Sequence, residues 1–88
     1  MIEEKVSGGV QSLEVGLSVL NALLEHNQPI ILKDLSSKLE MHPAKVHRYL
    51  VSLIRMEYAK QLDDGQYALG DQAWRLGLNC VQHSDTLQ

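Results

Sequence analysis

Hydrophobic positions in the first third of the chain recur with helical spacing. One apolar stripe, at i, i+4, i+7 and i+11, consists of Leu13, Leu17, Leu20 and Leu24. This spacing predicts a helix from Leu13 to about His26. A second stripe beside it consists of Gly16, Val19 and Leu23. A helix with so wide an apolar surface either lies deep in a core or makes two contacts, so the second stripe is either core or a dimer contact.

Two shorter helices are predicted next, joined by a tight turn. Ile30 and Ile31 form a short extended segment, and the pattern then predicts a helix over Leu32–Leu39 with leucines facing inward. Glu40-Met41-His42 is the turn. Pro43 starts the following helix, at a position where proline is well tolerated. This helix spans residues 43–56, and its inward face consists of Val46, Leu50, Leu53 and Ile54. The layout is that of a helix-turn-helix.

Two candidate strands and a last helix complete the pattern. The strands, Tyr58–Leu62 and Gln66–Leu69, are joined by Asp63-Asp64-Gly65, and Asp-Gly is a strong hairpin signal. A hairpin directly after such a helix is a wing. The last helix runs from about Gln72 to Val81, and its apolar face, which includes Trp74 and Leu78, is expected to pack against the first helix or a partner helix.

The predicted fold is therefore mainly α with a small β-hairpin, a winged helix-turn-helix. We expect a flexible tail over residues 1–9, the winged domain over 10–70, and a connecting helix with a frayed end over 71–88. The 88 residues suffice for one domain, and 44% hydrophobic with 22% charged residues is ordinary for a globular protein. The single cysteine, Cys80, fits a reducing cytoplasm, and no apolar run approaches the roughly 18 residues that span a bilayer.

Charge is distributed unevenly. The formal net charge is −3, yet Met41–Leu62 holds four cations and one anion, a local charge of +3, while the rest of the chain carries −6. Nucleic-acid affinity follows the local patch more than the total charge. Because +3 is modest, we expect weak binding per protomer and a dependence on dimerisation.

Candidate DNA-contacting residues lie on the outward face of the 43–56 helix. Advancing 100° per residue from Val46 places Lys45, Arg48, Ser52 and Arg55 opposite the apolar face, with His47 and Tyr49 flanking it. We expect Arg48 to bond guanine or phosphate, Lys45 to bond either, and Ser52 and Arg55 to contact the backbone. His47 is expected to donate a hydrogen bond to a phosphate or to pack at the helix edge. Tyr49 is expected to bond a phosphate through its hydroxyl or to lie over the wing. Lys60 is the candidate contact from the wing.

Catalytic and metal chemistry have little support. Cys80 and His83 make only two ligands, whereas a zinc site needs three or four. The chain has no glycine-rich phosphate loop, nucleophile elbow or convincingly spaced acidic pair. We therefore expect no catalytic residues, no metal and no cofactor.

The sequence resembles the amino-terminal DNA-binding domain of the IclR family of bacterial transcription regulators. The resemblance rests on Val10-Gln11-Ser12-Leu13-Glu14, on Leu35 and Leu39, on Val46-His47-Arg48 followed by Leu50, and on Gly65-Gln66-Tyr67-Ala68-Leu69-Gly70. Three segments depart from the family pattern. Glu40 and Glu57 stand where glycine is common, and Pro43-Ala44-Lys45 stands where Lys-Ser-Thr is common.

The resemblance implies a domain that places its 43–56 helix in the major groove of operator DNA as a homodimer, in a regulator that usually represses. It also implies a larger carboxy-terminal domain, absent from this sequence, that binds a small-molecule effector. Dimer contacts are expected through Leu13–Leu24 and Trp74–Val81. The rival hypothesis is a winged-helix module for protein association without DNA, which the acidic total charge favours and the cationic outer face opposes.

Overall fold

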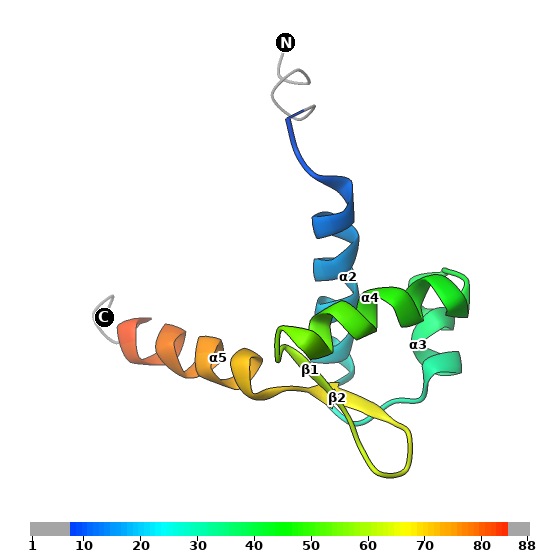
Figure 1. Ribbon diagram of the computed structural model, residues 1–88. Coiled ribbons are helices and arrows are strands. Elements are labelled where there is room, and N and C mark those ends of the chain that lie inside the picture. The colour runs from blue at the N-terminus through cyan, green and yellow to red at the C-terminus, as the bar shows by residue number, and fades with distance from the viewer. Residues whose placement is uncertain (1–7, 85–88) are drawn as a thin grey trace.

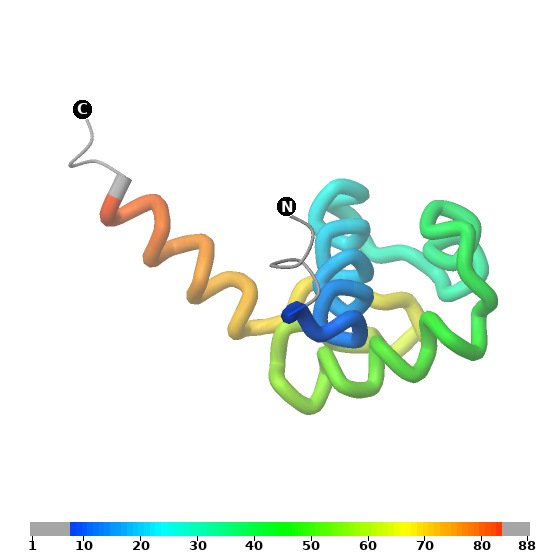
Figure 2. The backbone as a smooth tube through the Cα atoms, turned by 90° about the horizontal axis from the view of Figure 1, so that it is seen from above, coloured from blue at the N-terminus to red at the C-terminus, as the bar shows by residue number. Residues whose placement is uncertain are grey.

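The computed structural model describes residues 8–84. In chain order its elements are α2 (Gln11–His26), α3 (Leu32–Leu39), α4 (Pro43–Arg55), β1 (Ala59–Gln61), β2 (Tyr67–Leu69) and α5 (Asp71–Ser84). Helices α2, α3 and α4 with the hairpin form the body, and α5 projects away from it (Figures 1 and 2). Mainly helical structure with one small hairpin confirms the predicted fold class. Most of the expected tail over residues 1–9, and the expected fraying beyond residue 84, lie outside the described residues.

The core lies where α2, α3, α4 and the hairpin meet. Its nine buried hydrophobic residues are Val19, Ala22, Leu23, Ile30, Leu35, Val46, Leu50, Ala59 and Tyr67. Two of these, Val19 and Leu23, belong to the second stripe of α2, so that stripe is core. The first stripe faces outward, with Leu13, Leu17 and Leu24 exposed. The structure thus decides between two stripes that helical periodicity alone could not distinguish.

The turn between α3 and α4 is tight because its first residue adopts a left-handed conformation. Glu40 has φ of 56°, and its backbone N–H donates to the carbonyls of Ser36 and Ser37. Met41 N–H also donates to the Ser36 carbonyl at 3.1 Å. This arrangement satisfies carbonyls that the end of α3 leaves unpaired. Glu40 therefore occupies the left-handed conformation for which glycine is usual.

The hairpin is shorter than predicted and joins a third extended segment. Antiparallel pairing matches Ala59 with Leu69 and Gln61 with Tyr67. Ile30 and Tyr67 also exchange two backbone hydrogen bonds, of 3.0 and 2.8 Å. The predicted extended segment at Ile30 thus forms a bridge that ties the loop after α2 to the hairpin.

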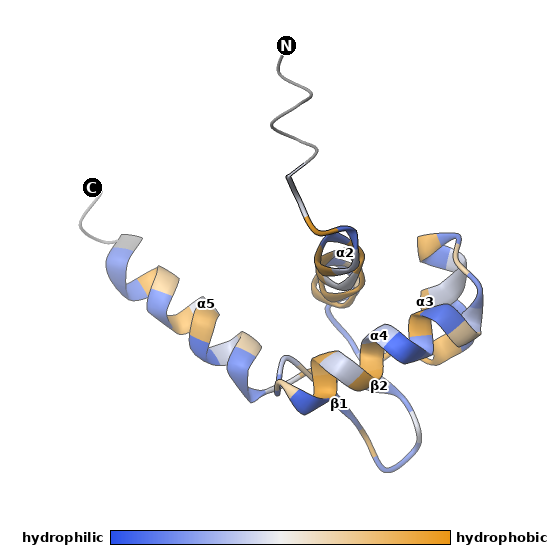
Figure 3. Ribbon diagram, turned by 45° about the horizontal axis from the view of Figure 1, so that its top comes forward, coloured by the Kyte–Doolittle hydropathy of each residue, from blue (hydrophilic) through white to orange (hydrophobic). Residues whose placement is uncertain are grey.

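Helix α5 is held at its first turn. Gly70 accepts from the N–H groups of Ala73 and Trp74, and Gln72 N–H donates to the Glu57 carbonyl at 2.8 Å. Beyond this turn the helix carries hydrophobic residues along its length although it leaves the body (Figure 3). Trp74, Leu78 and Val81 are about 60% exposed. The expected packing of Trp74 and Leu78 on α2 is therefore not made within this chain, because α5 diverges from α2. No helix among the described residues is long and apolar enough to span a membrane.

Candidate nucleic-acid interface

Helix α4 is fixed at its start by the residue just before it. The His42 imidazole Nδ1 accepts a hydrogen bond of 3.0 Å from the backbone N–H of Ala44. The His42 carbonyl also accepts from the N–H groups of Lys45 and Val46. Pro43 lacks an N–H group and occupies the first helical position, where none is needed. From the sequence, His42 was expected only as part of the turn. Its place directly before Pro43, the first residue of the helix, is nevertheless the place of a capping residue.

The inner face of α4 anchors it to the body. Val46 and Leu50 are fully buried, and Leu53 and Ile54 are partly buried against the same core. The helix lies across α2 and beside α3, as Figures 1 and 2 show. With its inner face held in this way, the opposite face of α4 is directed to solvent.

The outer face of α4 brings together most of the predicted contacts. Lys45, His47, Arg48, Ser52 and Arg55 are all exposed. Arg48 and Arg55 lie seven residues apart, two helical turns, and so share one face. None of the cationic side chains of α4 forms a hydrogen bond or ion pair within residues 8–84, so their donors are available to a ligand. Phosphate and guanine edges are the nucleic-acid groups that such donors recognise.

Tyr49 lies on a different side of α4. It is partly buried against the core, and its Cδ1 lies 3.7 Å from the position that a Cβ on Gly16 of α2 would occupy. Its ring therefore packs at the α2–α4 contact. Ser52 also borders the apolar groove of about 590 Å³ between these two helices.

Lys60 lies on the hairpin and not on α4. It is exposed on β1, beside the buried Ala59, and borders a cavity with Leu62, Ala68 and Trp74. Strand alternation places Lys60 on the hairpin face opposite Ala59, which packs into the core. The strand was predictable from the sequence, but the residues that lie beside Lys60 were not.

The tip of the wing is closed by its own hydrogen bonds. The Gln61 Nε2 donates to the Gly65 carbonyl at 3.1 Å, and Gln66 donates to both carboxylate oxygens of Asp64, at 3.0 and 2.8 Å. The hydrogen bonds from the Gln66 backbone and side chain lower the pKa of Asp64. The tip thus presents the Asp64 carboxylate, which opposes close approach to phosphates.

Comparison with known proteins places this geometry in a family. Residues 12–63 match the model of the IclR helix-turn-helix domain. The chain is 29% identical over 83 residues to the Acetate operon repressor of Salmonella typhimurium, covering 93% of this chain and 30% of that protein. It is 32% identical over 77 residues to the HTH-type transcriptional regulator BhcR of Paracoccus denitrificans, covering 88% of this chain and 25% of that protein.

Among solved structures, the crystal structure of Pseudomonas aeruginosa HmgR superposes with a TM-score of 0.83 at 39% identity, covering 89% of this chain and 34% of that one. The chain thus spans about a third or less of the length of each of these relatives. The segment that matches the family model, residues 12–63, contains the turn and α4, and so includes the whole cationic outer face. The chain therefore belongs to the IclR family, as the winged helix-turn-helix DNA-binding domain of a transcription regulator.

Proposed function

We propose that α4 enters the major groove of operator DNA. The observation that carries this proposal is the outer face of α4, where Lys45, Arg48 and Arg55 are exposed and unpaired within the described residues while Val46 and Leu50 anchor the opposite face. A helix held by its inner face and cationic on its outer face has the form that helix-turn-helix proteins insert between phosphate backbones.

Each predicted contact has a role set by its chemistry and place. The planar guanidinium of Arg48 bonds guanine O6 and N7 together, and Lys45 bonds a phosphate or guanine. Ser52 and Arg55, further along the helix, bond the DNA backbone, and His47 donates to a phosphate. Tyr49 lies beside the groove between α2 and α4 and bonds a phosphate through its hydroxyl. Lys60 contacts the DNA backbone from the wing.

The domain acts as a homodimer. Exposed leucines of α2, and Trp74 and Leu78 of α5, form two apolar surfaces that are exposed within residues 8–84. Burial of such surfaces against a second copy is the strongest general driving force for association. Two copies also double a local charge of only +3, so dimerisation supplies affinity that one α4 lacks.

The longer regulator is a bacterial, cytoplasmic protein that acts as a repressor, a role supported by the name of the Salmonella relative. Within it, residues 10–70 form the winged domain and 71–88 the connecting segment. A small-molecule effector binds to a carboxy-terminal domain. This is supported by the greater length of the relatives, which leaves room for a second domain. The domain itself is non-catalytic and needs no cofactor.

The test is binding to labelled duplex from the upstream region of the protein's own gene, against a scrambled duplex, over a salt series. We expect preference for the upstream duplex and an affinity that falls steeply with salt, because each neutralised phosphate contributes about −0.9 to the slope of log K against log salt. A folded protein that binds neither duplex at low salt would contradict the proposal and favour a protein-association module.

A further inference from the structure

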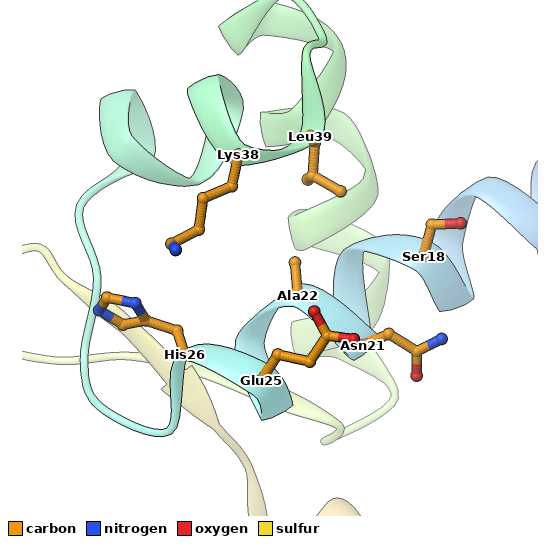
Figure 4. A pocket seen from close by; sticks show the side chains of 7 residues that line it. All are labelled: Ser18, Asn21, Ala22, Glu25, His26, Lys38 and Leu39. Carbon is orange, nitrogen blue, oxygen red and sulfur yellow. The ribbon is translucent and has the colours of Figure 1, made fainter.

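A polar pocket lies between α2 and α3, outside the DNA-facing surface. Its volume is about 420 Å³, which is in the range of small-ligand sites. Asn21, Glu25 and His26 line it from α2, and Lys38 lines it from α3 (Figure 4). Ala22 and Leu39 give it an apolar floor. No residue of α4 or the hairpin contributes to the lining, so a ligand here leaves the outer face of α4 uncovered.

Charges of opposite sign occupy different parts of this pocket. In Figure 4 the Lys38 side chain extends toward His26 on one side, while the Glu25 carboxylate lies on the other side near Ala22. Neither Lys38 nor Glu25 forms an ion pair or a side-chain hydrogen bond within residues 8–84. Two opposite charges therefore border one cavity and remain unneutralised by each other. A ligand that carries both a carboxylate and an ammonium group would match this arrangement.

The remaining polar group of the lining serves the fold. The Ser18 hydroxyl donates to the Glu14 carbonyl at 3.0 Å, within α2. Asn21 is exposed and has no such intrahelical bond, so its amide is available on the side of Glu25. Recognition would thus rest on four groups, namely one ammonium, one imidazole, one carboxylate and one amide.

We propose that this pocket binds a small zwitterion of the amino-acid class. The ligand carboxylate faces Lys38 and His26, its ammonium group faces Glu25 and Asn21, and its hydrocarbon part rests on Ala22 and Leu39. Such a ligand would join α3 to α2 and brace the helix pair that positions α4. Because the pocket is open to water, which screens both charges, we expect a dissociation constant on the order of 1 mM.

The test is an amide NMR titration of the ¹⁵N-labelled protein with L-leucine, L-alanine and L-glutamine. Isocaproate and isoamylamine serve as controls, because each keeps the leucine hydrocarbon but only one of its charges. We expect saturable shifts confined to the residues around 21–26 and 38–39 with an amino acid, and much weaker shifts with either control. Absence of saturable shifts with all three amino acids at roughly tens of millimolar would overturn the proposal.

Two variants with matched controls separate the pocket from general charge effects. Lys38→Met and Glu25→Gln each remove one charge from the lining, and each should weaken amino-acid binding about tenfold, equivalent to about 1.4 kcal/mol. Lys33→Met and Glu14→Gln make the same changes elsewhere on α3 and α2 and should leave binding unchanged. Equal weakening by pocket and control variants, or equal binding by isocaproate or isoamylamine, would refute the zwitterion site. The amino-acid titration contains no DNA, so its result does not depend on whether the protein binds DNA.

Discussion

Replacement of Arg48 is expected to separate DNA binding from folding. Its side chain is exposed and makes no hydrogen bond or ion pair with the described part of the chain. We expect Arg48→Glu to lower DNA affinity by at least about tenfold, since a good bidentate base contact contributes about 1–3 kcal/mol and the new carboxylate repels phosphate. Gel-shift titration gives the affinity, while circular dichroism and sedimentation should show unchanged folding and association.

Arg75 provides the matched control for this change. It is exposed on α5, where its guanidinium donates to Gln72. Arg75→Glu makes the same change of charge away from α4 and should retain most of the affinity. Equal loss in both variants would mean that total charge, and not the outer face of α4, governs binding.

Gly70 is required by a close approach of backbone atoms. A Cβ at this position would lie 2.7 Å from the Glu57 carbonyl oxygen and 2.9 Å from that of Ala59. We expect Gly70→Ala to lower the free energy of unfolding by about 1–3 kcal/mol, because backbone cannot move aside as a side chain can. Urea denaturation measures this change.

Gly77 is the corresponding control. A Cβ there meets nothing within 4 Å. Gly77→Ala should leave the free energy of unfolding unchanged or raise it by up to about 1 kcal/mol, because alanine favours the helix. Equal stability of Gly70→Ala and Gly77→Ala would contradict the close approach of the Glu57 and Ala59 carbonyls to Gly70.

At the scale of elements, the wing contains a pH-sensitive contact. Hydrogen bonds from the Gln66 backbone and side chain stabilise the Asp64 carboxylate and lower its pKa. A lowered pKa in the folded state means that the contact stabilises the hairpin above the ordinary carboxylate pKa. This stabilisation is lost as pH falls through the lowered value. We expect an NMR titration of the Asp64 side-chain carbonyl carbon to have its midpoint below that of a free aspartate.

Gln66→Ala tests the cause of this shift. The variant removes the side-chain donor and retains the backbone N–H, so the Asp64 midpoint should rise part of the way toward its ordinary value. An unchanged midpoint in Gln66→Ala would show that the side-chain hydrogen bond has no influence on the carboxylate.

The elements themselves differ in how well their limits could be predicted. Helix α3 has the predicted limits and α4 ends one residue earlier than predicted, because their apolar spacing, the turn and Pro43 are local signals. Helix α2 begins two residues before Leu13, and α5 extends beyond Val81. Both strands are shorter than predicted, since pairing depends on a partner strand and not on composition alone.

At the scale of the whole molecule, the exposed leucines of α2 predict the behaviour of the domain in solution. Leu17 is 47% exposed and borders the groove between α2 and α4. We expect Leu17→Glu to shift the protein from dimer to monomer and to weaken DNA binding, because a carboxylate in a buried dimer contact is unfavourable. Analytical ultracentrifugation over a concentration series measures the change.

Ser37→Glu is the control for this variant, because it adds the same charge to an exposed position of α3. It should leave the association state unchanged. If the unsubstituted protein sediments as a monomer at high concentration, dimerisation through α2 is wrong for this length of chain.

The sequence by itself determined the elements, the turn between α3 and α4, and the cationic outer face of α4. These follow from periodicity within one helix, where neighbours at i+3 and i+4 are set by geometry alone. The family assignment was likewise available from Val46-His47-Arg48 and the Gly65–Gly70 segment, and the match over residues 12–63 confirms it.

Tertiary structure alone decided which apolar surfaces are buried in the core and which are exposed. It buried Val19 and Leu23, exposed Leu13 and Leu17, and turned Tyr49 toward Gly16. It also left the Trp74–Val81 face of α5 uncovered and placed Glu25 and Lys38 around one pocket. These outcomes depend on where distant segments pack. A helix fixes the direction in which each of its side chains points, but only the neighbouring elements decide what that side chain contacts.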